Sequence, residues 1–160
     1  PRQSQVWAVL RQDDSLQRSA YSLAATFLGR MCLSGEVHDL SPAQWKLTLG
    51  AMELYRRVYP IISDGVSTFH AATGESWRHP QGCQAVLRRS TKGDRALLVV
   101  HSFAKPFERE LSIDLPEGGG WKLAEAWPER SGHAVRVSRG KLWVELKGAF
   151  RAVVCLLERG

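Results

Sequence analysis

The pattern of apolar and polar positions changes character near residue 64. Before it, short apolar runs alternate with stretches whose apolar residues recur every three or four positions, which is the spacing of an amphipathic helix. After it, short runs rich in Val, Leu and Ile are separated by clusters of Gly, Pro, Asp and Glu, which is typical of strands joined by turns. The sequence therefore predicts two units of different architecture, residues 1–63 and residues 64–160.

The first unit begins with a strand, a helix and a second strand. Gln5–Leu10 (QVWAVL) is a short apolar run expected to form a buried strand, and residues 31–33 are expected to form the next. Asp14 or Ser15 is expected to cap the intervening helix, and Gly29 to end it. With the helix that follows, the order is strand, helix, strand, helix, which implies parallel packing of the two strands.

The second helix is predicted over residues 42–59. Ser41-Pro42-x-Gln44 is a capping box with Pro at the first helical position. Its apolar residues form two stripes on roughly opposite sides, which predicts a helix packed between two layers; the alternative is one buried stripe with a few exposed apolar side chains. The first stripe contains Ala43, Leu47, Ala51, Leu54 and Val58, and the second contains Trp45, Leu49, Met52 and Tyr59.

The second unit is predicted to consist of strands alone. ERELSIDL alternates polar and apolar residues, as a strand with one solvated face does, whereas ALLVV and AVVCLL are apolar throughout and should be central. TKGD, PEGGG and SRGK supply turns. Short strands at this spacing indicate an antiparallel sandwich. The expected strands are residues 67–71, 84–89, 96–103, 108–115, 122–127, 134–137, 142–146 and 152–157.

The charge and the cysteines exclude some classes of protein. The formal net charge is +6, but the basic residues are scattered, and no zinc-finger, RNP or basic-helix pattern accompanies them, so no nucleic-acid partner is expected. The densest basic group, expected to be a solvated surface, is Arg88, Arg89, Lys92 and Arg95. No apolar run is long enough to predict a membrane span. Three widely spaced cysteines predict buried free thiols in a cytoplasmic protein.

Residues 34–40 hold the most concentrated group of ionisable side chains. Glu36, His38 and Asp39 could be metal ligands, but their spacing matches no common ligand framework. Glu36 and Asp39 could be an acid–base pair, although glycosidase carboxylates usually come from separate elements. The third interpretation is a polar turn before the Ser41 cap. No metal and no cofactor is expected.

Position favours a site at this turn. In parallel α/β architecture ligands bind at the carboxyl ends of the strands, and two loops leave the predicted strands there, residues 11–15 and 34–40. A separate segment, TGESW with HPQG after it, places Trp77 near His70 and His79. Those residues could stack on a sugar ring or could form a structural loop against a core tryptophan.

The order of these segments resembles a known family. PRQSQVWAVL, then YSLAATFLGRMCLSGEVHDLS, then a helix ending in LYRRVYPIISDG, then a β domain, is similar to the C-terminal end of α-galactosidase-type glycoside hydrolases of the melibiase clan. The most specific motif is LSGEVHDLS followed by an amphipathic helix and I-x-x-G. The resemblance covers nearly the whole chain, is strongest over residues 1–65, and is mostly architectural beyond them.

The resemblance implies an α+β fold: the last two β/α units of a (β/α)₈ barrel followed by an antiparallel β-sandwich. Gln5–Leu10 would be the seventh barrel strand, residues 30–33 the eighth, and the helix from Pro42 the last barrel helix. It also implies a retaining α-galactosidase whose two catalytic aspartates lie upstream of Pro1, so no catalytic residue is expected here. Since the chain begins without Met, its original N-terminus is expected to lie upstream.

The same resemblance implies a role at the edge of the substrate site for Ser34, Gly35 and Glu36, where the family often has Asp in place of Glu36. The expected partners are an α-galactoside, the remainder of the barrel, and a second copy of the chain. Two barrel strands without neighbours would expose parallel edges, so association, or rearrangement of residues 1–35, is expected. The alternative function is a non-catalytic carbohydrate-binding or interaction sandwich that uses Trp77, Trp121, Trp127 and Trp143.

Overall fold

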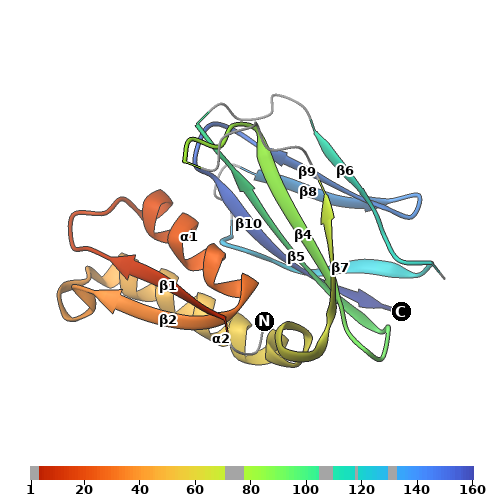
Figure 1. Cartoon of the computed structure of the whole chain (residues 1–160), viewed down its shortest axis with the longest axis horizontal. Helices are drawn as coiled ribbons and strands as arrows, with labels where there is room; N and C mark the ends of the chain where they lie inside the picture. Colours follow the sequence, from red (N-terminus) through yellow and green to blue (C-terminus); the bar gives the residue numbers. More distant parts are fainter. Residues whose placement is uncertain (1–3, 71–77, 105–109, 118, 130–132) are drawn as a thin grey trace.

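A computed structural model describes residues 4–70, 78–104, 110–117, 119–129 and 133–160 (Figure 1). Among these residues the fold is mixed, with the helices in the first part of the chain and antiparallel sheets in the rest. The first part contains β1 (Gln5–Leu10), α1 (Leu16–Ala25), the short 3₁₀ turn η1 (Thr26–Leu28), β2 (Arg30–Gly35), the 3₁₀ turn η2 (Val37–Asp39) and α2 (Pro42–Asp64).

β1 and β2 form a parallel pair, as the order of segments predicts. Their register runs from Gln5 opposite Arg30 to Leu10 opposite Gly35, so β2 extends two residues beyond the prediction. Ser15 caps α1 by accepting a hydrogen bond from the Arg18 backbone N–H. Residues 4–35 thus keep the strand–helix–strand arrangement rather than rearranging.

Gly29 plays a different role from the predicted one. α1 ends at Ala25 and passes into η1, and Gly29 follows with φ −158°, which is extended backbone rather than the left-handed conformation of a helix-ending glycine. A Cβ at Gly29 would lie 2.7 Å from the Ser4 carbonyl oxygen. Close approach of the chain before β1, not helix termination, is therefore what requires glycine here.

α2 is longer than predicted and continues through Pro60 to Asp64. Pro60 is exposed, whereas Ile61 and Ile62 are fully buried, so packing of the last turn outweighs the hydrogen bond that the proline cannot make. The Ser41–Gln44 capping box is present as predicted.

One predicted stripe of α2 is buried. Ala51, Leu54 and Val58 have no exposed surface, whereas Leu49 and Tyr59 of the second stripe are exposed. α2 still lies between two layers, since the Tyr55 hydroxyl donates to Gly29 O at 2.9 Å and accepts from Met31 N at 3.0 Å, on the side of β2. The prediction of two buried stripes is wrong for the second stripe, whose Leu49 and Tyr59 are exposed and whose Trp45 is only half-buried against the core.

The second part of the chain is an antiparallel sandwich, as predicted. Within the described residues, one sheet has the order β3-β4-β5-β10-β7 and the other the order β6-β9-β8. The change from helix to sheet lies at Gly65, beside the predicted boundary. The strands are β3 (Val66–His70), β4 (Cys83–Arg89), β5 (Arg95–Ser102), β6 (Leu111–Asp114), β7 (Trp121–Trp127), β8 (His133–Ser138), β9 (Lys141–Leu146) and β10 (Ala152–Arg159).

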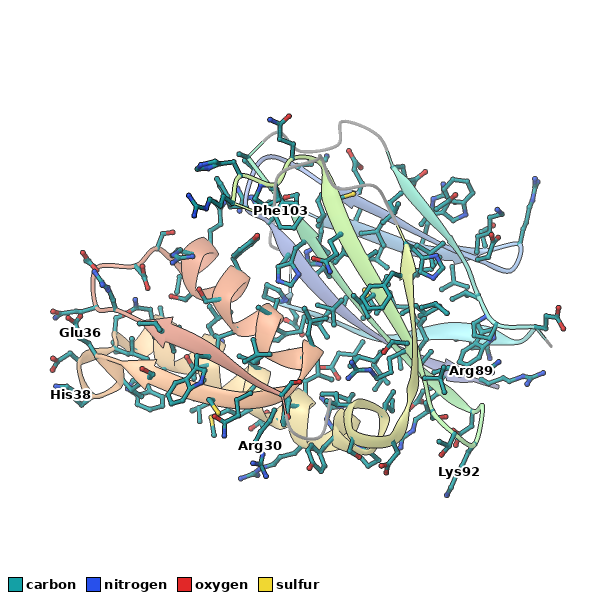
Figure 2. The ribbon with its side chains drawn as sticks, viewed as in Figure 1. Arg30, Glu36, His38, Arg89, Lys92 and Phe103 are labelled. Carbon is teal, nitrogen blue, oxygen red and sulfur yellow. The ribbon has the colours of Figure 1, made fainter. Side chains whose placement is uncertain are left out.

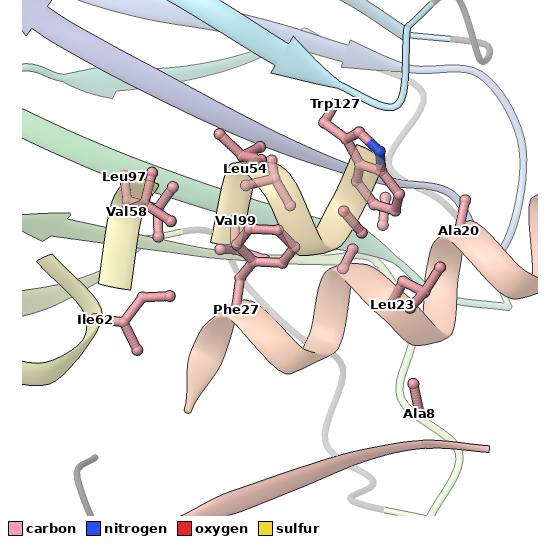
Figure 3. Packing of buried hydrophobic residues seen from close by; sticks show 14 of the residues in the cluster. Ala8, Ala20, Leu23, Phe27, Leu54, Val58, Ile62, Leu97, Val99 and Trp127 are labelled. Atoms are coloured by element: carbon pink, nitrogen blue, oxygen red, sulfur yellow. The ribbon is translucent and has the colours of Figure 1, made fainter. Parts of the chain in front are cut away.

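The larger sheet has a hydrophobic core on each face. Strands β5 and β10 are buried along nearly their whole length, and alternate residues point to opposite sides. Leu97, Val99 and Val154 join the helices in one cluster, whereas Leu98 and Cys155 join the smaller sheet in the other. Figure 3 shows the first cluster, where Phe27, Leu54 and Trp127 meet. The two parts of the chain therefore share one core.

The cysteines are free, with Cys83 and Cys155 buried and Cys32 half-buried, as predicted. Burial raises the pKa of the Cys155 thiol to about 12. No helix in the described part of the chain is long and apolar enough to span a membrane.

Candidate functional site

The two loops at the carboxyl ends of β1 and β2 lie side by side. The last pair of the register is Leu10 and Gly35, and the Glu36 backbone N–H donates to Leu10 O at 2.8 Å, which continues the pairing one residue further. Figure 2 shows Glu36 and His38 at this end of the molecule, far from Arg89 and Lys92. We refer to residues 11–15 and 34–40 together as the rim.

Glu36 connects the two loops of the rim. Its carboxylate oxygen Oε2 accepts a hydrogen bond from the Gln12 backbone N–H at 3.1 Å. The residue is exposed, and its other oxygen has no hydrogen bond to the described residues. Glu36 can therefore hold the rim with one oxygen and present the other to a ligand.

Gln44 holds the rim from beneath, which the sequence alone does not reveal. Its Oε1 accepts from Ser41 N at 2.8 Å, as the capping box predicts. Its Nε2 donates to the carbonyl oxygens of Asp14 at 2.9 Å and Arg11 at 3.0 Å, and the side chain is buried. A buried amide must satisfy both of its ends, so one residue caps α2 and orders the loop after β1. In the sequence, this role is indicated only by the amide nitrogen of the capping glutamine, which the capping box leaves without a partner.

Gly35 is required where β2 turns into the rim. Its φ is +92°, a conformation that residues with a Cβ rarely adopt. A Cβ at this position would also collide with the Leu10 carbonyl oxygen. The glycine lets the chain turn sharply while it stays paired with β1.

Ser34 lies on the open face of the β1–β2 pair. Ala8 and Leu10 point toward the helices and are fully buried, whereas Trp7 is 59% exposed and Val9 is 46% exposed. The register places Ser34 opposite Val9. An apolar face thus leads along the strands to a polar rim.

His38 and Asp39 belong to the turn rather than to a site with Glu36. They lie on η2, both exposed, with His38 Nε2 3.2 Å from Asp39 Oδ2. Within the described residues, no group of three or more His, Cys, Asp or Glu side chains is placed to hold a metal ion. Of the predicted trio, Glu36 alone ties the two rim loops together.

The predicted basic surface is wrong for Arg88. This side chain is 5% exposed and points into the core, where burial lowers the pKa of its guanidinium. It donates to Ser67 Oγ at 2.8 Å, Ile62 O at 3.0 Å and Leu28 O at 3.2 Å. Alternation along β4 sends Arg88 inward and Arg89 outward, which a count of charges cannot register.

The tryptophans of the sandwich form no open platform in the described residues. Trp121 and Trp127 are buried, and Trp143 is half-buried with the Arg136 guanidinium 4.6 Å from its ring centroid. Trp77 lies outside the described residues. His70 Nε2 is 2.8 Å from Thr68 Oγ1, so this histidine has a local partner within β3.

Comparison with known proteins identifies the fold. No family model and no curated protein sequence matches the chain. A single-substitution variant of the α-galactosidase AgaA of Geobacillus stearothermophilus, of glycoside hydrolase family 36, matches with a TM-score of 0.64 and 12% identity. The α-galactosidase of Lactobacillus brevis matches with a TM-score of 0.65 and 10% identity. The galactosidase domain of the α-galactosidase–sucrose kinase AgaSK matches with a TM-score of 0.61 and 14% identity.

Each match covers 98% of this chain and 22% of the other, so the chain spans about a fifth of the length of these enzymes. AgaA variants have been crystallised with raffinose and with stachyose. The predicted resemblance to part of an α-galactosidase is thereby confirmed for the fold.

Proposed function

We propose that this chain is the C-terminal part of a retaining α-glycosidase of the α-galactosidase type. In this proposal β1, α1, β2 and α2 are the last two β/α units of a (β/α)₈ barrel, and the sandwich follows the barrel. The two catalytic aspartates lie on barrel strands upstream of this chain. The chain supplies part of the barrel wall and part of the substrate rim.

The open face of the β1–β2 pair is the observation that carries the proposal. Parallel sheets occur in proteins almost only with both faces covered. Here the helices cover one face, while Trp7 and Val9 on the other remain exposed. Within the described residues, each of the two strands is paired only with the other. Six further β/α units would cover the face and pair both edges, and the rim would then lie at the mouth of the barrel, where active sites of such barrels occur.

The rim residues have distinct roles in this arrangement. In a retaining glycosidase one carboxylate attacks the anomeric carbon and the other protonates the leaving oxygen, and both need the sugar held in position. Ser34 and the free oxygen of Glu36 would bond sugar hydroxyls. Gly35 keeps the backbone turn between them, and Gln44 orders the neighbouring loop. These residues position substrate and transfer no proton.

Hydrolysis of an aryl α-galactoside tests the proposal. The longer protein that contains this chain should release the aryl alcohol, and the 160-residue chain alone should not. Turnover by the chain alone would contradict the proposal. So would a lack of turnover by the longer protein, provided that its circular dichroism spectrum shows it to be folded. Inspection of the upstream sequence for two aspartates at strand ends is an independent check.

Substitutions in the longer protein test the rim. Glu36→Gln keeps the hydrogen bond from Gln12 N but replaces the free carboxylate oxygen with an NH₂ group, which cannot accept from a sugar hydroxyl, and Ser34→Ala removes one hydroxyl. Loss of one hydrogen bond to substrate, about 1 kcal/mol, should reduce kcat/KM about fivefold in each. His38→Ala, an exposed change on η2, is the matched control and should leave kcat/KM unchanged. Equal effects at all three positions would argue against a rim role.

The isolated chain is expected to self-associate through the open face. Analytical ultracentrifugation should show a concentration-dependent dimer or larger species, which Trp7→Ser should weaken. A monomer at all concentrations would show that the open face tolerates solvent, and would remove the main support for a barrel.

A further inference from the structure

A groove between α2 and β7 lies apart from the rim. Its volume is about 500 Å³, within the range of small-molecule sites. The Arg57 guanidinium and the Glu125 carboxylate close one end with an ion pair at 2.6 Å and so join the helix to the strand. The walls are mainly apolar, from Leu16, Leu47, Ala126 and Pro128.

Trp127 presents an unused hydrogen-bond donor to this groove. Its side chain is 6% exposed and is held against Phe27, with the two ring centroids 6.1 Å apart. The indole Nε1 has no acceptor among the described residues and is not one of the fully buried unpaired atoms, so the donor reaches the groove. Gly50 faces the same edge, and a Cβ there would lie 3.4 Å from Nε1. The absence of a side chain at position 50 therefore leaves the donor open to the groove.

Two glutamate carboxylates supply hydrogen-bond acceptors to the groove. Glu53 and Glu129 line the groove, and within the described residues neither carboxylate forms an ion pair or hydrogen bond. Lys46 balances part of their charge. The groove thus combines apolar walls, one indole N–H donor and two carboxylate acceptors, with little net charge.

We propose that this groove binds a neutral sugar ring as a second, non-catalytic subsite. A sugar hydroxyl can accept from Trp127 Nε1 while others donate to Glu53 and Glu129, and the C–H face of the ring can pack on the apolar walls. An apolar ligand would leave the indole N–H unpaired, and a strongly charged one would meet charges of both signs. The choice of ligand class rests on the proposed function, whereas the groove does not.

The test is a titration of the ¹⁵N-labelled chain with raffinose, followed by NMR. Each tryptophan indole N–H gives a separate signal and so serves as a separate probe. The Trp127 indole signal, assigned by its disappearance in Trp127→Phe, should shift saturably while the Trp121 signal stays in place. Glycerol at the same hydroxyl concentration controls for a general solvent effect. Trp127→Phe, followed through the Ala126 amide, should weaken binding about fivefold through loss of one hydrogen bond.

Two substitutions at Gly50 separate blocking from unfolding. Gly50→Leu should fill the groove and abolish the shift, whereas Gly50→Ala, which adds a single Cβ 3.4 Å from Nε1, should weaken binding without abolishing the shift. Both place a better helix former than glycine in α2, so neither should lower the melting temperature. We expect a Kd of about 1 mM, so about 100 mM sugar should saturate the site. The inference is overturned if no saturable shift appears at that concentration, or if the shift persists in Gly50→Leu.

The longer protein distinguishes this inference from the proposed function. Turnover without a Trp127 response would refute the subsite and leave the glycosidase intact. A Trp127 response without turnover would refute the glycosidase alone. If the longer protein lacks the response that the isolated chain shows, a protein segment fills the groove and the subsite is refuted for the intact protein.

Discussion

Replacing Arg88 by Met should destabilise the whole chain, because this side chain joins elements from both units. Its guanidinium donates to the last residue of η1 through Leu28 O, to the C-terminal turn of α2 through Ile62 O, and to β3 through Ser67 Oγ. Carbonyls at helix ends have no partner within their own helix. Arg88 therefore satisfies two helix ends from a strand of the sandwich.

The magnitude follows from what the substitution leaves behind. Each buried carbonyl without a donor costs about 1–3 kcal/mol, and two are affected. Removing the guanidinium also removes the free-energy cost of burying its charge, which is the effect that lowers its pKa. This gain offsets part of the loss. We expect a net decrease of about 2–4 kcal/mol in the free energy of unfolding. Arg88→Lys should lose most of the same amount, since a single ammonium cannot serve three separate acceptors.

Urea unfolding measures the effect through two signals, helical circular dichroism and tryptophan fluorescence. Arg89→Met is the matched control, because Arg89 is exposed on the same strand and its loss should change stability by less than about 0.5 kcal/mol. Wild type should show coincident transitions, since both parts share one core. If Arg88→Met unfolds at the same urea concentration as Arg89→Met, the three buried hydrogen bonds of Arg88 do not stabilise the fold as argued.

Two further predictions concern His101 and Gly35. His101 is buried, and desolvation lowers its pKa to about 4, below the value near 6.5 of an exposed histidine. The unfolded chain therefore binds a proton that the folded chain does not as pH falls from about 6.5 to about 4, and this should cost about 3 kcal/mol of stability. Urea unfolding at pH 7 and pH 4.5 should show a smaller drop for His101→Gln than for wild type; equal drops would contradict the pKa assignment. Gly35→Ala should lower stability by about 2 kcal/mol or more, since it adds a collision with Leu10 O to the cost of a positive φ. Gly93→Ala, with φ +74° and open space around it, should show the φ cost of about 1 kcal/mol alone, and thermal unfolding of the two variants separates the terms.

The sequence was most informative where a structural element depends on its own residues. The run Gln5–Leu10 became β1 at the predicted bounds, and the Ser41–Gln44 capping box opened α2. The strands of the sandwich appeared within a few residues of their expected places, because glycine-containing turns and period-two alternation are local signals. The parallel order of β1 and β2 followed from the helix between them.

The sequence was least informative where a residue serves a distant partner. The predicted helix ends at residue 59, but burial of Ile61 and Ile62 carries α2 past Pro60 to Asp64. Gln44 looked like a cap alone, and Arg88 like part of a basic surface. The position of each side chain is decided by distant backbone carbonyls. Arg88 bonds to Ile62 O and Leu28 O, 26 and 60 residues away. Gln44 bonds to Asp14 O and Arg11 O, 30 and 33 residues away.

The candidate site divides in the same way. The sequence by itself determined that a strand ends and a turn begins at Ser34, Gly35 and Glu36, since strand and turn are encoded in neighbouring residues. Only the tertiary structure decided that Glu36 bonds to Gln12 N across the rim, that Ser34 lies on an open apolar face, and that Trp127 turns its indole N–H toward Gly50. The physical reason is that hydrogen bonds and burial depend on distance in space, whereas the sequence records only distance along the chain.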